Sequence, residues 1–399
     1  MKENLKKYLP WLNLYHLFCI AFGAFAFISV VATTHLNPLH SFFGWSSVAS
    51  MRQNLMLFCF IMFWLKNPSP GMKKSLCFLI LPALFLISSR HSGTQNFLSI
   101  LIFVFYVSDE DIKVIITSLG IGTLLGILAT IGSVLLGIIP NIVTEGTRIR
   151  QAWGFGVPVL LSGFYLNVGY VYLYLQRKKL TIIKLVVLLL PAVWIYLVTD
   201  GRMSFFSLIL VSLLCYIFTK INTHRKKIAN ILAIFSIFTF ITSFFLIIIL
   251  ARNLETNQFV GTLNSFSTGR ISWAATYLDI YSPSFWGQSI ARVGVADSRI
   301  IGQPVMVLDN AFLTMLLEQG VFVLLVTTIA LFALINYLRK KEDVVSLVIW
   351  SIIILTFSIG NNSLYFWRNP LIFQFVYLIR DWDSRIIKRS DEVLGNEEN

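Results

Sequence analysis

The segment KLVVLLLPAVWIYLVTDGRMSFFSLILVSLLCYIF, residues 184–218, decides the fold class of this chain. Two long apolar runs flank one polar turn, Asp200-Gly201-Arg202, and both runs are apolar enough to sit in a hydrocarbon layer about 30 Å thick. Because lipid offers the backbone no water, such runs must form helices or a closed barrel. The apolar residues are continuous rather than alternating, so they predict helices.

The remainder of the chain has the same character. Of its 399 residues, 56% are hydrophobic and 13% are charged, and the mean hydropathy is +0.76. A soluble domain carries about twice that share of charge. We therefore predict an all-α polytopic bundle, a single transmembrane domain over 1–399 with about twelve spans. These run over roughly 12–32, 46–65, 75–89, 94–108, 114–138, 154–175, 182–199, 203–219, 228–250, 309–337, 344–360 and 363–380.

Lysine and arginine in the connections set the predicted orientation. The clusters KENLKK, KNPSPGMKK, QRKK and KINTHRKK, and the C-terminal RDWDSRIIKR, alternate onto one side of the predicted spans. Basic loops stay in the cytoplasm, so we expect a cytoplasmic-membrane protein with both termini cytoplasmic. Residues 251–308 then form one large extracytoplasmic loop between the ninth and tenth spans. The net charge of +13 is ordinary topology charge and requires no nucleic-acid partner.

The two basic residue types sort differently across this topology. All sixteen lysines fall on the predicted cytoplasmic side, whereas the outer side has ten arginines and no lysine. A guanidinium is a planar fork of donors that matches phosphate oxygens and stays charged when partly buried. The pattern predicts a phosphate-bearing anion outside; the alternative is long side chains at helix ends that reach lipid headgroups. The outer arginines are Arg52, Arg90, Arg148, Arg150, Arg202, Arg252, Arg270, Arg292, Arg299 and Arg368.

Arg202 and Arg270 are the strongest candidates for binding such an anion. Arg202 ends a three-residue turn in which Gly201 permits a tight backbone and Asp200 can orient the guanidinium. Arg270 opens GRISWAATYLDIY, whose apolar spacing predicts a short helix along the membrane surface. An anion at the first turn of this helix would also gain from the helix N-terminus.

Four further side chains are candidates for substrate binding beside these arginines. Trp273 and Tyr277 lie on the predicted surface helix, where they either stack on sugars or anchor the helix at the interface. Arg148 and Arg150 lie in TRIRQAWGFGVP, before a glycine-containing turn.

The phrase LDNAFLTMLLEQG places three polar side chains at the tenth predicted span. Asp309 and Asn310 stand at its outer mouth, and Glu318 lies about two and a half turns inside it. A carboxylate inside a span is costly and tends to face a cavity, so Glu318, like Asn310 and Asp200, is a candidate for substrate binding. The alternative for Glu318 is a role in helix packing or in pairing with an arginine. On one straight helix Asp309 and Glu318 would lie on opposite faces, so they would act together only if that helix breaks.

Four phrases, in order along the chain, resemble the Wzy-type O-antigen and capsular polysaccharide polymerases, whose relatives include the O-antigen ligases. They are RQAWGFGVP, TDGRMSFF, STGRISWAATYLDIYSPSFWGQS and LDNAFLTMLLEQG, within residues 148–325. The resemblance implies an integral-membrane glycosyltransferase whose donor and acceptor are polyprenyl-pyrophosphate-linked oligosaccharides on the outer leaflet. It also implies a chain-length regulator and a flippase as partners, and no cofactor.

The resemblance assigns roles to individual residues. Arg202 and Arg270 would bind the donor pyrophosphate, with Arg150 as a weaker candidate. Asp309 stands near the position where the ligases carry a histidine base, so we predict Asp309 as the base, with Asp200 in reserve, and a polymerase rather than a ligase. We expect inversion at the anomeric carbon and no metal, since no outer cluster of acids is typical of a divalent site.

Two other functions stay open. A flippase of the same lipid-linked saccharide would share the many spans, but usually shows related halves or matching interrupted helices. A structural membrane scaffold would leave the two Gly-Arg phrases unexplained.

Overall fold

Helices dominate the computed structural model, which describes residues 14–36, 45–66, 72–107, 112–144, 149–221, 224–267, 269–292, 308, 310–359 and 369–380. Seven helices are long and apolar enough to cross a membrane, which confirms the predicted all-α membrane class. Their apolar segments are Val48–Leu65, Ile112–Leu135, Pro158–Gln176, Ile182–Thr199, Arg202–Lys220, Arg225–Arg252 and Val321–Lys340.

Five shorter apolar helices lie within or overlap the other five predicted intervals. These are His16–Val31, Phe78–Ser92, Phe97–Tyr106, Val344–Thr356 and Pro370–Arg380. Helix positions along the chain therefore follow the hydropathy pattern closely, while twelve as the number of true membrane spans stays a prediction. The chain divides into two compact units, each of which is described by itself.

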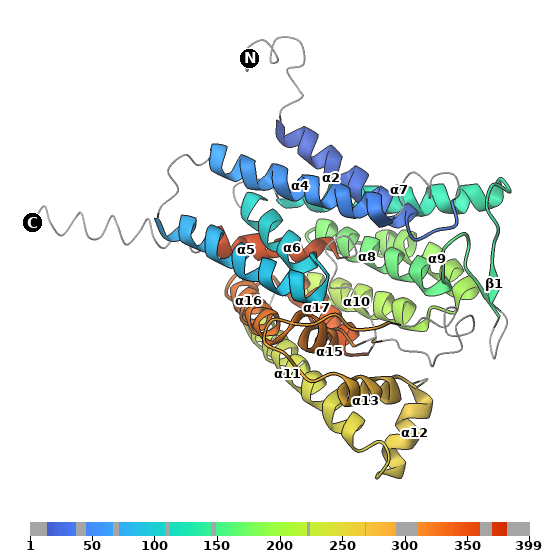
Figure 1. The fold of residues 1–399 in the computed structure, drawn as a ribbon. Helices are drawn as coiled ribbons and strands as arrows, with labels where there is room; N and C mark the ends of the chain where they lie inside the picture. The colour runs from blue at the N-terminus through green and yellow to red at the C-terminus, as the bar shows by residue number, and fades with distance from the viewer. Residues whose placement is uncertain are drawn as a thin grey trace, which may run out of the picture. The chain divides into compact units, whose positions relative to one another are not determined.

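Unit 1 comprises 1–59, 109–220 and 366–374. Its helices are the first part of α4 (Trp45–Lys66), which crosses the division, with α2 (Leu14–Val31), α7 (Ile112–Leu135), α8 (Pro158–Gln176), α9 (Ile182–Thr199) and α10 (Arg202–Lys220). A short hairpin of β1 (Val143–Thr144) and β2 (Arg150–Gln151) joins α7 to α8 (Figure 1). Helices α2 and α7 approach closely because Gly23 and Gly122 meet between them, as small residues do in membrane helix pairs.

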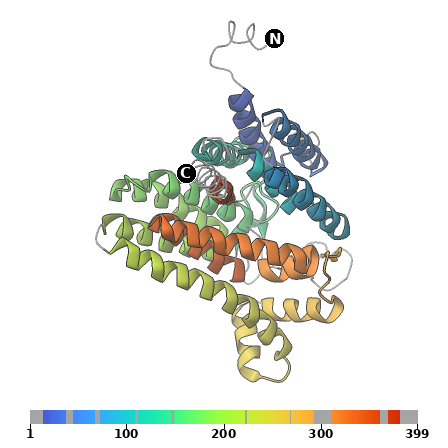
Figure 2. The same ribbon diagram turned by 90° about the vertical axis from the view of Figure 1, so that its left-hand side faces the viewer.

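Unit 2 comprises 60–108, 221–365 and 375–399. Its described elements are α5 (Met72–Ser92), α6 (Asn96–Tyr106), α11 (Arg225–Arg252), α12 (Gln258–Phe266), α13 (Arg270–Ile280), α15 (Ala311–Thr314), η2 (Met315–Gln319), α16 (Val321–Lys340) and α17 (Val344–Ile359), with η3 (Pro370–Phe375) at the division. Long α11 packs against α16 and α17, and α12 and α13 gather at one end of it (Figure 2). The Ser236 and Ser351 hydroxyls, 2.7 Å apart, join α11 to α17.

The predicted extracytoplasmic loop is partly helical. The short helix expected from Arg270 onward is confirmed as α13, which packs on α11, and α12 precedes it. Its place at a membrane surface stays a prediction.

The predicted tenth span, 309–337, is not one continuous helix. A single turn of α15 leads into the π-helix η2, which ends at Gly320 with φ 94° and ψ 166°, and α16 begins at Val321. An L-residue cannot easily adopt this backbone, so the glycine ends the first segment and allows the second to begin in a new direction. The straight-helix geometry expected for Asp309 and Glu318 therefore does not apply.

In each unit the described lysines lie at one end together with some arginines, such as Arg177 and Arg339, and other arginines lie at the opposite end. In unit 1 Lys184 donates to the Gln176 side chain and to the Lys179 carbonyl, at the end where α8 stops and α9 starts, while Arg150 and Arg202 lie at the opposite end. In unit 2 Arg339, beside Lys340 and Lys341, donates to Asn230 near the start of α11. Arg252, Arg270 and Arg292 lie towards the other end of that unit.

Candidate functional site

The turn between α9 and α10 brings three of the predicted residues together in unit 1. Arg202 Nε donates to Asp200 Oδ1 at 2.9 Å, and Arg150 Nη2 lies 3.6 Å from Asp200 Oδ2. The side chain of Asp200 is 19% exposed, compared with 32% for Arg150 and 53% for Arg202. Asp200 thus contacts Arg202, the residue that it is predicted to orient, and the same carboxylate also faces Arg150.

The backbone of this turn is tight for a different reason than the one expected. Asp200, with φ 48° and ψ 37°, is the left-handed residue that ends α9, a conformation that aspartate tolerates better than most residues. Gly201 instead serves a close approach: a Cβ there would lie 2.6 Å from the Ser162 Cβ and 3.1 Å from Thr199 Oγ1. Glycine is therefore required because α8 passes directly beside the turn.

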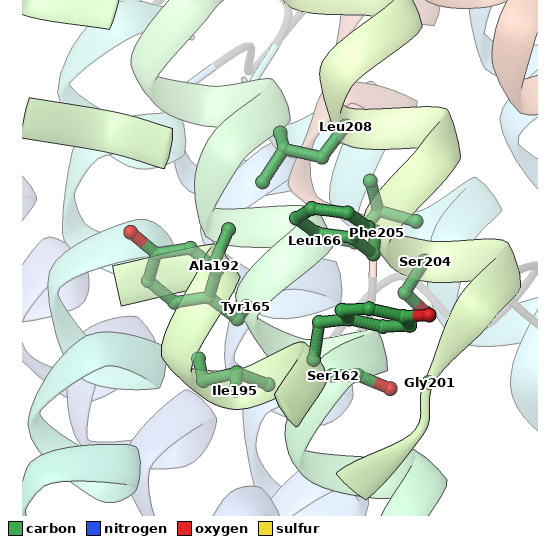
Figure 3. A pocket seen from close by; sticks show the side chains of 10 residues that line it. Ser162, Tyr165, Leu166, Ala192, Ile195, Gly201, Ser204, Phe205 and Leu208 are labelled. Atoms are coloured by element: carbon green, nitrogen blue, oxygen red, sulfur yellow. The ribbon is translucent and has the colours of Figure 1, made fainter. Parts of the chain in front are cut away.

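A small pocket lies against this turn, between α8, α9 and α10 (Figure 3). Ser162 and Gly201 are among its lining residues, as are Tyr196 and Phe205, whose rings stack with centroids 4.4 Å apart. The pocket has room for about one water molecule. The pocket is too small for a saccharide, so a sugar would have to lie outside it.

The β-hairpin supplies Arg150. Arg150 pairs with Thr144 across the two strands. The Asn141 side chain stabilises the hairpin, because it donates to the Gln151 side chain and accepts from the Trp153 backbone N–H at 2.8 Å. Arg148, the other candidate of this cluster, lies outside the described residues.

In unit 2, Glu318 pairs with Arg292, one of the ten outer arginines and not one of the predicted site residues. Arg292 Nη2 donates to Glu318 Oε2 at 2.8 Å, with the glutamate side chain 9% exposed and the arginine side chain 36% exposed. The pairing with an arginine that is one alternative for Glu318 is thus present, and its role in substrate binding stays a prediction.

The residues before Arg292 dock into the helix break at Gly320. Gln288 N donates to Glu318 O at 2.9 Å, and Val321 N and Phe322 N donate to Ser284 O and Phe285 O. These bonds satisfy backbone groups that the interruption of the helix would otherwise leave unpaired.

Two glycines make this approach possible. A Cβ on Gly320 would lie 2.6 Å from Phe285 O and 2.7 Å from Trp286 C, and a Cβ on Gly287 would meet the carbonyls of Glu318 and Gln319. The loop segment and the broken helix therefore fit together only as backbone against backbone. Ser88 Oγ adds a bond to Gln319 O from α5 at 2.7 Å.

The tyrosines of α13 fix the loop backbone next to Arg292. Tyr277 Oη donates to Ala291 O at 2.7 Å, and Ala291 N donates to Tyr281 Oη at 2.9 Å. Tyr277 is fully buried, and this burial raises the pKa of its hydroxyl to about 12. Such a position favours a structural part for Tyr277 over stacking on a sugar, whereas Trp273 is only half-buried.

The other candidates of unit 2 lie at helix starts. Arg270 is the first residue of α13, after Gly269 at φ 84°. Asn310 is buried and caps α15, its Oδ1 accepting from Leu313 N at 2.9 Å. Asp309, the predicted base, lies outside the described residues.

The ion pairs described above bring only some of the predicted site residues into contact. Arg150, Asp200 and Arg202 meet in unit 1, and Glu318 meets Arg292 in unit 2; a single site shared by Arg202 and Arg270 stays a prediction. The described residues include no group of three or more His, Cys, Asp or Glu side chains arranged to hold a metal ion. Comparisons with protein-family models, curated proteins and solved structures give no match.

Proposed function

We propose that this chain is an integral-membrane glycosyltransferase that joins polyprenyl-pyrophosphate-linked oligosaccharide repeat units on the outer leaflet, as polymerases of surface polysaccharides do. One observation carries the proposal: Arg150 and Arg202 both face the carboxylate of Asp200, at the end of unit 1 opposite the described lysines of that unit. Two guanidinium groups and one carboxylate carry a net charge of about +1, and the carboxylate orients the N–H donors of both arginines. That arrangement suits a diphosphate.

The proposed reaction is a direct displacement. The acceptor hydroxyl oxygen attacks the anomeric carbon of the donor, the bond from that carbon to the diphosphate oxygen breaks, and polyprenyl diphosphate leaves. The hydroxyl proton passes to the Asp309 carboxylate, and the anomeric centre is inverted. Negative charge grows on the leaving diphosphate, so prepositioned guanidinium groups lower the barrier.

Each residue has a stated part in this proposal. Arg202 and Arg270 bind the departing diphosphate, and Arg150 assists Arg202 through their shared carboxylate, Asp200. Trp273, half-buried on α13, is the candidate to stack on a sugar.

The test is a reconstitution with purified protein and lipid-linked repeat units, read out as a ladder of longer saccharides. A ladder from the unaided wild type supports the proposal, and none under conditions in which the protein is folded contradicts it. Arg270→Lys is expected to insert normally yet make no ladder, because an ammonium lacks the fork of donors. Asp309→Asn is expected to stop transfer while donor binding survives.

A flippase is the second candidate, and the broken helix at Gly320 favours it. Interrupted helices are common around the sites of transporters, and the described part of this chain contains one in the tenth predicted span. Proteoliposomes carrying lipid-linked saccharide separate the two functions: a flippase changes the leaflet of the saccharide without lengthening it. An O-antigen ligase would instead transfer a saccharide once, to a different lipid acceptor.

A further inference from the structure

Arg292 is restrained through the residue that precedes it and through its own guanidinium. Ala291, the preceding residue, has its carbonyl bonded by Tyr277 and its N–H bonded to Tyr281. The guanidinium itself donates to the buried Glu318. An arginine in a loop normally keeps much of its conformational freedom, and these bonds remove part of that freedom from Arg292.

Stability alone is a weak reason for the Arg292–Glu318 pair. Removing a carboxylate such as that of Glu318 from water is costly, and an apolar side chain of similar size in its place is often as stable. Glu318 is nearly buried, yet the side chain of Arg292 stays 36% exposed, so the pair extends from the packed interior to the surface of unit 2. The carboxylate thus holds the arginine from behind.

The same device occurs at the other cluster. Arg202, more exposed, is held at 2.9 Å by the less exposed Asp200, and Arg292 is held at 2.8 Å by the less exposed Glu318. Each carboxylate turns a flexible cation into an oriented fork of donors, the requirement for phosphate recognition.

We propose that Arg292, with Glu318 as its positioning residue, binds a phosphate group of a diphosphate ester. The identification of this ester as a lipid-linked saccharide rests on the proposed function. The binding of a phosphate group by Arg292 does not depend on that function. The helix break contributes to the site, since Gln288 N bonds to the carbonyl of Glu318 and ties the loop to the residue that holds its arginine.

The binding test uses inorganic pyrophosphate and the purified protein in phosphatidylcholine nanodiscs, measured by calorimetry. Arg292→Lys retains an ion pair with Glu318, which protects the fold, but lacks the fork; we expect its Kd for pyrophosphate to rise about 10-fold or more. Arg252→Gln, at an exposed arginine towards the same end of unit 2, is the matched control and should bind as the wild type does. Equal Kd values for wild type and Arg292→Lys would overturn the proposal.

A second arm identifies the source of the phosphate. Adding phosphatidylglycerol to the nanodiscs should leave pyrophosphate binding unchanged if the site takes a diphosphate ester. Loss of the Arg292-dependent binding in those discs would assign the site to a lipid headgroup and overturn its link to the substrate.

A neutral pair tests for a purely structural role. In Arg292→Gln/Glu318→Gln the two amides can still form a hydrogen bond. If the pair has only a structural role, this variant would keep both the thermal stability and the function of the wild type. We expect normal thermal unfolding but weakened pyrophosphate binding and, in the reconstitution, a raised KM for lipid-linked donor. Normal binding by this folded variant would refute the proposal. Arg292-dependent binding by a wild type that makes no ladder would instead refute the polymerase function and leave this site standing.

Discussion

Replacing Gly320 with alanine tests the contact between the backbone of residues 284–288 and the helix break in unit 2. The backbone at this position, φ 94° and ψ 166°, is nearly exclusive to glycine and costs about 2 kcal/mol for another residue. The new Cβ would lie 2.6 Å from Phe285 O, the acceptor for Phe322 N, so the docked segment must move away. Losing the bonds from Val321 N and Phe322 N adds about 1 kcal/mol each. The total, about 4 kcal/mol, is a large share of the roughly 5–15 kcal/mol that stabilises a folded protein.

Hydrogen exchange followed by mass spectrometry measures the loss of stability at the helix break itself. The amides of Val321 and Phe322 should be protected in the wild type and exchange at least 100-fold faster in Gly320→Ala, since about 2.7 kcal/mol corresponds to that factor. Gly261→Ala is the matched control: it lies in α12 of the same unit, and its Cβ would meet nothing within 4 Å. Equal protection in the two variants, with equal melting temperatures, would refute the assigned role of the backbone docking.

Other predictions concern both units. Asp200→Asn should leave folding intact but lower the rate of ladder formation about 10-fold or more, because Arg202 loses its charged partner; an unchanged rate would show that this orientation is not used. Gly201→Ala should reduce the yield of folded protein through contact with Ser162, and Ser162→Gly in the same chain should restore part of it, as size-exclusion chromatography would show. Since the pKa of Tyr277 is raised to about 12, the folded state keeps a proton that the unfolded state loses above pH 10; the contribution of Tyr277 to stability is therefore complete below pH 10 and lost as pH rises towards 12. Tyr277→Phe should flatten that part of the melting temperature against pH, and an identical slope would contradict the assignment.

Within the candidate site, the sequence could predict only contacts between residues that are close together in the chain. Asp200 and Arg202 are two positions apart in a turn, so their pairing follows from the phrase itself. Arg150 is fifty positions from Asp200, and a hairpin is needed to deliver it. Such a distant pairing leaves no periodic signal in a single sequence.

Arg292 shows the same limit more sharply. Nothing in the sequence distinguishes it from the other nine outer arginines, and the apolar run around its partner Glu318 predicts one continuous helix. The sequence offered one relevant signal, Gly320 directly after LLEQ, but a glycine within an apolar run is also common in continuous membrane helices. The break became evident only with the docked segment 284–288 beside it.

The sequence by itself determined that this chain is a helical membrane protein and where most of its helices lie, because hydropathy over about twenty residues is a local property that lipid selects directly. It could not determine which face of each helix meets protein. Leu188 and Leu190 of α9 are chemically identical, yet one is 5% exposed and the other 69%. In lipid both faces of a helix are apolar, so only tertiary packing decided which side chains are buried, where the tenth predicted span breaks, and which carboxylate each arginine meets.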